Sequence, residues 1–154
     1  MRIMLARDVM TTEVITVHQE EKLKEVARIL MDNKISGLPV VDDAHHVVGI
    51  ISEKDMVVTA GQLQIPFYIT LFDGIIFLEN PKKFQEKLKR FTASKVKEVM
   101  STEVIFVEED TPLDDVISIL QKHKINRLPV LRNDKLVGII SKNDILKAMV
   151  QNNG

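Results

Sequence analysis

The chain has 154 residues, no cysteine, 45% hydrophobic and 28% charged residues, and a formal net charge of −1. The balance of hydrophobic and charged residues is typical of a folded protein. The absence of cysteine excludes disulfides and thiolate metal sites. The near-neutral charge gives no reason to expect nucleic acid or an acidic membrane as a partner.

The longest apolar stretch, residues 65–78, is too short to span a bilayer and contains Asp73. The first residues lack the apolar core of a signal peptide. We therefore expect a soluble, cytoplasmic protein with no membrane partner.

The chain contains the same pattern twice. Residues 6–41 align without gaps on residues 96–131, with sixteen of thirty-six positions identical. Residues 47–55 then align on 136–144, with six of nine positions identical. Two copies with this agreement should fold alike. We expect three parts, a first repeat at 6–58, a linker at 59–95 and a second repeat at 96–150.

In each copy a short β-branched strand comes first, at 14–17 or 104–107. A helix follows, with apolar residues at the i, i+3, i+4, i+7 spacing, namely Leu23, Val26, Ala27 and Leu30, or Leu113, Val116, Ile117 and Leu120. In the second copy Thr111 is the expected N-cap and Pro112 the first helical residue. Two strands and a final helix complete each copy, at 38–41, 47–51 and from Ser52, or at 128–131, 136–140 and from Ser141.

One unit of about fifty residues is too small to bury a good core alone. Its apolar strands need cover on both faces. We therefore predict an α+β fold in which two β-α-β-β-α repeats pack sheet against sheet as an intramolecular pseudo-twofold pair. Such a pair leaves two related clefts.

Each copy ends in the motif Gly-hydrophobic-hydrophobic-Ser-x-x-Asp, at 49–55 and 138–144. The glycine would let a ligand approach the backbone, and a serine at a helix start can face a phosphate. The aspartate can accept two hydrogen bonds from a ribose diol. The same spacing is close to a capping box, which only satisfies the helix N-terminus. Spacing alone favours the cap, because caps are far commoner than nucleotide sites.

The β-α-β-β-α order, with this motif twice after a Leu-Pro-Val strand, resembles the CBS domain, named after cystathionine beta-synthase. The resemblance covers 6–58 and 96–150. It implies a regulatory module that senses an adenine nucleotide (AMP, ADP or ATP), as in energy sensing, or an adenosyl compound such as S-adenosylmethionine, without a required cofactor. It also implies a homodimer. Because no effector domain flanks the two repeats, we expect the output to act in trans on an unknown protein partner. The alternative is a structural or protein-interaction module with vestigial clefts.

The resemblance implies that each cleft takes its aspartate from one repeat and its adenine contacts from the other. The first cleft would hold Ser52, Asp55, Ile105, Ile125, Asn126 and Arg127. The second would hold Ser141, Asp144, Ile15, Ile35, Ser36 and Gly37.

Arg127 in the second copy aligns with Gly37 in the first. A guanidinium can bind phosphate bidentately, so we expect the cleft at Asp55 to be the tighter site. Replacing Arg127 with alanine should lower AMP affinity by roughly 10- to 100-fold. The alternative is that Arg127 is a solvated surface residue.

The linker is rich in aromatic residues. Asp73-Gly74 suggests a turn between apolar arms, and Asn80-Pro81 suggests the start of a helix at about 81–91. Phe84, Leu88 and Phe91 would form an apolar stripe on that helix. This stripe either covers an exposed side of the fold or forms a partner surface, and the pattern does not choose.

No catalytic constellation emerges from the four histidines and the serines, so an enzyme is not expected. No set of metal ligands at a suitable spacing is present either.

Overall fold

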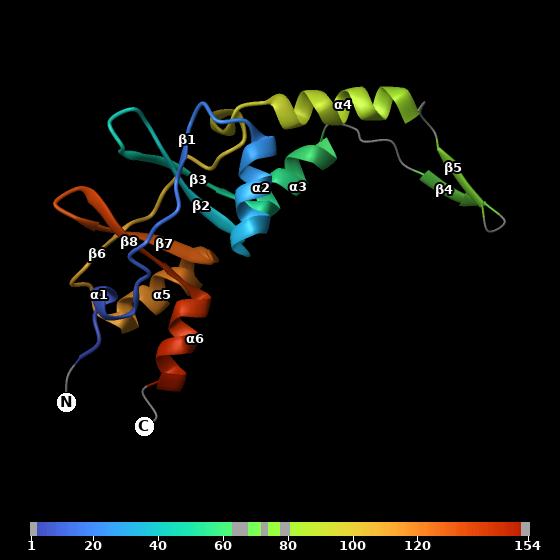
Figure 1. Cartoon of the computed structure of the whole chain (residues 1–154). Helices are drawn as coiled ribbons and strands as arrows, with labels where there is room; N and C mark the ends of the chain where they lie inside the picture. Colours follow the sequence, from blue (N-terminus) through green and yellow to red (C-terminus); the bar gives the residue numbers. More distant parts are fainter. Residues whose placement is uncertain (1–2, 63–67, 72–73, 78–80, 152–154) are drawn as a thin grey trace.

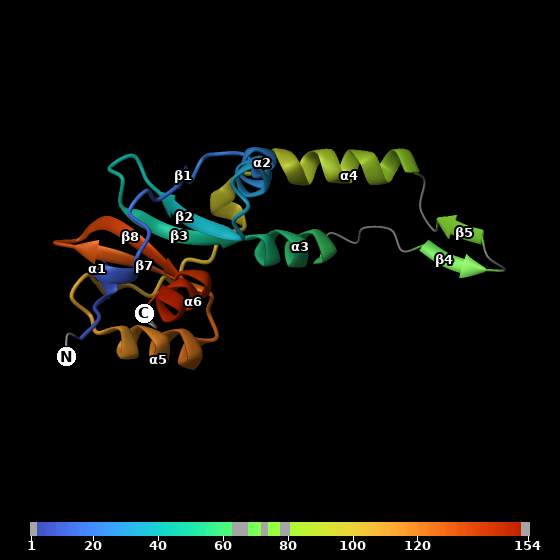
Figure 2. The same ribbon diagram turned by 60° about the horizontal axis from the view of Figure 1, so that its bottom comes forward.

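The computed structural model describes residues 3–62, 68–71, 74–77 and 81–151. Two three-stranded sheets face each other, each with a central strand that is parallel to one neighbour and antiparallel to the other (Figures 1 and 2). The first sheet consists of β1 (Val17–His18), β2 (Gly37–Val41) and β3 (Val47–Ser52). The second consists of β6 (Val107–Glu108), β7 (Arg127–Arg132) and β8 (Lys135–Ser141).

Helices cover the outer faces of the two sheets, α2 on the first and α5 on the second (Figure 2). This layering buries both faces of the apolar strands, so every residue of β2 is buried. The predicted pair of β-α-β-β-α repeats is confirmed. The helices of the repeats are α2 (Leu23–Asn33), α3 (Glu53–Gln62), α5 (Leu113–His123) and α6 (Lys142–Gln151).

The first strand of each repeat is shorter than the sequence predicts and begins later. β1 starts at Val17, although the β-branched run begins at Val14. Its only registered partners are Val40 and Val41. The residues before Val17 run beside the cleft instead, where Val14 and Ile15 line its wall.

Two short segments exchange places between the repeats. The opening segment of the first repeat contains α1 (Ala6–Val9), and the opening segment of the second contains the 3-10 turn η1 (Val96–Glu98). The Ala6 amide donates to the Thr111 carbonyl at 2.8 Å, and the Val96 amide donates to the Glu21 carbonyl at 2.8 Å. Each segment therefore joins the repeat to which its sequence does not belong.

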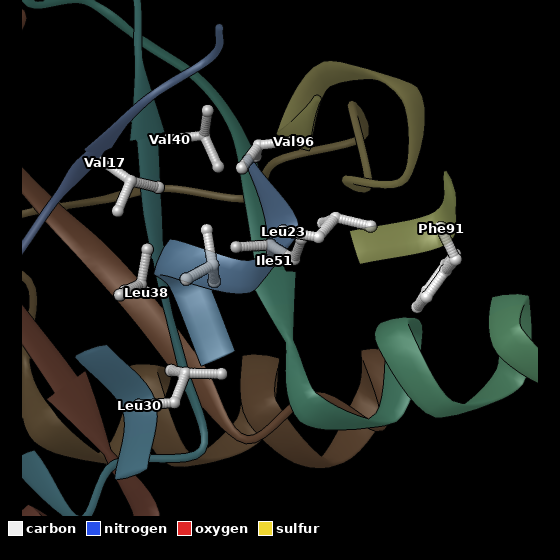
Figure 3. Packing of buried hydrophobic residues seen from close by; sticks show 9 residues of the cluster. Val17, Leu23, Leu30, Leu38, Val40, Ile51, Phe91 and Val96 are labelled. Atoms are coloured by element: carbon white, nitrogen blue, oxygen red, sulfur yellow. The ribbon is translucent and has the colours of Figure 1, made fainter. Parts of the chain in front are cut away.

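The exchange also supplies core residues. Ala6 is fully buried among second-repeat residues such as Val107 and Leu128. Val96 is fully buried with Leu23 and Ile51 of the first repeat, as the close view of that core shows (Figure 3). Each small repeat thus completes its core with a side chain from the other side of the pair.

An ion-pair cluster fastens the second segment to the first repeat. Glu20 accepts from Lys95 at 2.6 Å and from Lys97 at 2.7 Å. Hydrogen bonds from Lys95 and Lys97 lower the pKa of Glu20 from 4.5 to about 2.

The start of α5 differs from the sequence prediction. The helix begins at Leu113, Pro112 is the N-cap, and no side chain caps the helix end. The reason lies in the exchange, because the Thr111 carbonyl accepts from Ala6 and the Leu113 amide donates to the Met4 carbonyl. The Met4 carbonyl thereby accepts from one of the free amides at the helix N-terminus.

The linker leaves the body of the protein as an arm (Figures 1 and 2). It contains the antiparallel strands β4 (Tyr68–Leu71) and β5 (Gly74–Phe77), followed by α4 (Pro81–Ala93). Gly74 pairs with Leu71, so it opens the second strand rather than forming the turn. Asp73 and Asn80 lie outside the described residues.

The apolar stripe on α4 is only partly covered. Phe91 is 8% exposed and joins the first core, whereas Leu88 is 43% exposed. The side chain of Phe84 lies outside the part that the structure describes. No helix among the described residues is both long enough and apolar enough to cross a membrane.

Candidate functional site: a cleft shared by the repeats

A cavity of about 620 Å³ lies between the repeats. Its wall includes residues before and at the start of β2 in the first repeat and residues around the β8–α6 junction in the second. It brings together all six residues expected in the second cleft, Ser141, Asp144, Ile15, Ile35, Ser36 and Gly37.

The motif at the β8–α6 junction forms a capping box. Asp144 Oδ2 accepts from the Ser141 amide at 2.9 Å and from the Ser141 hydroxyl at 3.0 Å, and Ser141 Oγ accepts from the Asp144 amide at 3.2 Å. Ser52 and Asp55 make the same three bonds at the start of α3. The capping interpretation of the motif is therefore correct in both copies. It does not exclude ligand binding, because Oδ1 takes no part in the cap.

Thr11 also lines the cavity and contacts the carboxylate of Asp144. Its hydroxyl donates to Asp144 Oδ1 at 3.0 Å, and its backbone forms a two-way bridge with Ile139. Sequence reasoning missed this residue. The repeat alignment could have identified it, because Thr11 aligns with Ser101 and both copies therefore carry a hydroxyl at this position. The Ser101 backbone forms the same two-way bridge with Ile50.

Arg127, which was expected in the first cleft, lines the cavity of the second cleft. Its guanidinium donates to Ser36 Oγ and lies over Gly37, where an added Cβ would come within 2.5 Å of its Cζ. It lines the cavity at Asp144. Burial lowers the pKa of Arg127, while the charges of Asp55 and Glu53 oppose that shift. Arg127 therefore lies in the wall of the cavity at Asp144 and also within electrostatic reach of Asp55, and the expectation that the cleft at Asp55 is the tighter site stays a prediction.

The remaining residues expected in the first cleft are divided between two places. Ile105 and Ile125 are half-buried and pack against the core of the second repeat. Asn126 lies with Arg127 in the wall of the cavity at Asp144. Asp55 is half-buried at the start of α3, and the described residues offer its Oδ1 no hydrogen-bond partner.

The motif glycines have a structural role that differs from the expected one. A Cβ on Gly49 would come within 2.5 Å of Met100 Sδ, and one on Gly138 would collide with Met10. These methionines belong to the exchanged segments. The glycines thus admit a methionine from across the pair, and the space that a ligand would need beside them is filled.

Within the described residues, no group of three or more histidine, aspartate or glutamate side chains is placed to hold a metal ion. The polar groups that face the cavity are hydroxyls, amides, lysines, Arg127 and two carboxylates. Such a wall can bind a polar organic ligand through hydrogen bonds and charge, beside the apolar surfaces of Ile15 and Ile35.

The duplicated fold and the cavity between its halves define an intramolecular pair of β-α-β-β-α repeats. A family model described as CBS domain matches residues 6–59 and 96–151. The chain therefore belongs to the CBS domain family, as the resemblance implied.

The comparisons extend over almost the whole chain. The uncharacterized protein MJ1426 of Methanocaldococcus jannaschii is 33% identical over 156 residues, which cover 96% of this chain and 92% of that protein. The crystal structure of the CBS domain pair of protein MJ0100, in complex with 5′-methylthioadenosine and S-adenosyl-L-methionine, superposes with a TM-score of 0.73. It is 27% identical, and the match covers 99% of this chain and 100% of that chain. The structure of CBSX2 in complex with AMP has a TM-score of 0.72 at 24% identity, which shows the shared fold, and the match covers 97% of this chain and 98% of that chain.

Proposed function

We propose that this chain is a regulatory module that binds an adenine nucleotide or an adenosyl compound in the cleft at Asp144, without catalysing a reaction. One observation carries the proposal. A half-buried carboxylate, already oriented by its own helix cap and by Thr11, faces a cavity of about 620 Å³. The MJ0100 pair, of similar fold and 27% identity, binds two adenosyl compounds, which supports this ligand class.

The proposed roles follow from the chemistry of each side chain. Asp144 accepts one ribose hydroxyl through the remaining lone pair of Oδ1, because Oδ2 is committed to Ser141 and Thr11 donates to Oδ1. Ile15 and Ile35 provide apolar surface for the adenine ring. Arg127 of the second repeat donates a hydrogen bond to the hydroxyl of Ser36 of the first, and both residues line the same cavity.

The cleft at Asp55 is proposed as a second, related site. Ser52 and Asp55 have the same cap geometry as their counterparts, and Oδ1 of Asp55 is available among the described residues. Ile105, Ile125 and Asn126 would contact the adenine by analogy with the second cleft.

Calorimetric titration with adenosine compounds tests the proposal. Asp144→Asn is the sharpest variant, because the amide oxygen can still accept from Ser141 and keep the helix capped. Its NH2 group then replaces the acceptor that the ribose needs. We expect affinity at this site to fall by roughly 10- to 100-fold. Asp55→Asn is the matched variant in the other cleft.

If no adenosine compound binds the unmodified protein, the proposal is wrong and the alternative of vestigial clefts is favoured. If both variants bind as the unmodified protein does, the ligand lies elsewhere.

We also propose that the module forms a homodimer and acts in trans on a protein partner. The support is the apolar surface on α3 and α6, where Val57 is 71% exposed, Met149 60% and Val150 77%. Light scattering coupled to size exclusion tests the dimer. Val57→Glu with Met149→Glu should yield a monomer, and a monomeric unmodified protein would contradict the proposal.

A further inference from the structure

The wall of the cavity at Asp144 carries an excess of positive charge. Four cations line it against two carboxylates, which are Glu13 and Asp144. One cation comes from the end of α2, one from β7 and two from α6, so they converge from both repeats. The cations are Lys34, Arg127, Lys142 and Lys147.

The repeat alignment shows that the other cleft lacks this excess. Lys142 corresponds to Glu53, and Lys147 corresponds to Val58. Taken over every position that lines the cavity, the counterparts are three cations and three carboxylates, so the excess of two positive charges at Asp144 becomes a balance at Asp55. The cations are Lys54, Lys124 and Arg127, and the carboxylates are Glu53, Asp55 and Glu103.

Arg127 is a fixed cation in the wall of the cavity at Asp144. It is held in the cavity wall by Ser36, and within the described part of the chain it forms no ion pair with a carboxylate. Its charge is partly desolvated, which lowers its pKa. A partly buried cation attracts an anionic ligand more strongly than a fully solvated one does, although the charges of Asp55 and Glu53 offset part of this attraction. Its position is also fixed before the ligand arrives.

We propose that the cleft at Asp144 selects adenosine that carries phosphate, with an affinity that rises with the number of phosphate groups. The cleft at Asp55 lacks this selectivity. The inference rests on the proposed function, because it presupposes that adenosine compounds bind. Neutral 5′-methylthioadenosine gains nothing from the four cations, and the positive sulfonium of S-adenosylmethionine is repelled by them.

The test is a calorimetric comparison of four compounds without divalent cations, namely 5′-methylthioadenosine, S-adenosylmethionine, AMP and ADP. We expect ADP to bind most tightly and S-adenosylmethionine most weakly at the cleft that Asp144→Asn disables. Raising the salt from about 0.1 M to about 1 M shortens the Debye length from about 10 Å to about 3 Å. ADP affinity should fall with this change, while 5′-methylthioadenosine affinity should hold.

The charge itself is tested by giving the second repeat the residues of the first. The double variant Lys142→Glu with Lys147→Val should lower ADP affinity by roughly 10- to 100-fold. It should leave 5′-methylthioadenosine affinity within about twofold. The helix start tolerates the exchange, because an acidic residue is favourable in the first helical turn.

A matched pair of single variants separates the clefts. Lys34 and Lys124 end equivalent helices in the same left-handed conformation, with φ of 53° and 54°. Any backbone effect of replacing them is therefore shared. Lys34→Gln should weaken ADP binding at the cleft at Asp144, and Lys124→Gln should not.

The outcomes distinguish a failure of the proposed function from a failure of the charge selectivity. If no compound binds, the proposed function fails. If the compounds bind but S-adenosylmethionine or 5′-methylthioadenosine equals ADP, the charge selectivity is wrong and the function stands. Unchanged ADP affinity in Lys142→Glu with Lys147→Val overturns the selectivity in the same way.

Discussion

Replacing Val96 with alanine tests whether the exchanged segment stabilises the repeat that it joins. The Val96 side chain is fully buried in the core of the first repeat. Alanine removes two methyl groups, which at about 0.8 kcal/mol each gives about 1.6 kcal/mol of lost burial. A cavity that does not relax raises the loss toward about 2.5 kcal/mol.

Urea unfolding measures this loss as a lower midpoint at an unchanged slope. The control is Met31→Ala, a larger truncation at a side chain that is 78% exposed and lies outside the proposed dimer surface. We expect the control to stay within about 0.5 kcal/mol of the unmodified protein.

Amide hydrogen exchange shows where the loss acts. Protection should fall first in the first repeat, at Leu38 and Ile51, which share the core with Val96. A loss below about 0.5 kcal/mol would show that Val96 does not stabilise the first repeat. So would a loss of protection confined to the second repeat, because the segment would then stabilise its own repeat.

Three further predictions follow from single contacts. Gly49→Ala places a Cβ within 2.5 Å of Met100 Sδ and should lower the free energy of unfolding by about 1–3 kcal/mol in urea titrations. Thr11→Val leaves Asp144 Oδ1 without its partner and should weaken adenosine binding by up to about tenfold in calorimetry. Glu20→Gln should lower stability at neutral pH. The carboxylate's contribution is present above pH 4.5 and is lost as the pH falls toward about 2, so melting curves of the variant and the unmodified protein should converge there.

Each of these predictions has its own control. The double variant Gly49→Ala with Met100→Ala should lose less free energy of unfolding than the two single variants together, because the shorter side chain at position 100 relieves the contact. Thr11→Ser keeps the hydroxyl and should keep the affinity. Asp110→Asn changes the exposed counterpart of Glu20 and should show no matching pH dependence. Additive losses of stability would contradict the Gly49 prediction, and equal effects of valine and serine would contradict the Thr11 prediction. A stability difference between Glu20→Gln and the unmodified protein that persists at about pH 2 would contradict the Glu20 prediction.

The repeat, the strand order and the apolar helix faces were predictable because they rest on local spacing. Leu23, Val26 and Leu30 are buried as their periodicity predicts. The motif positions Ser141 and Asp144 also lie together at a cavity, because a three-residue spacing at a helix start fixes their separation.

The exchange of segments was not predictable from the alignment. Ala6 and Val96 align with each other, so the pattern is the same whether each segment packs on its own repeat or on the other one. Only the spatial arrangement of the pair decides between these two possibilities.

The position of Arg127 was missed for a different reason. The alignment identifies Gly37 as its counterpart but does not say how far a long side chain reaches. Near a pseudo-twofold axis, a reach of one side chain suffices to move a charge from one cleft into the wall of the other. The charge balance of a cleft therefore needs coordinates, even where its residues are known.

The exchanged segments have a consequence for how such a chain could arise and fold. A single repeat with its opening segment cannot fill its own core, because Ala6 or Val96 would reach into an absent neighbour. Two separate copies could complete each other only by colliding, at a rate set by their concentration. The linker makes that encounter intramolecular and so supplies a high effective concentration. Cutting the linker should therefore turn a folding reaction that is independent of protein concentration into one that depends on it.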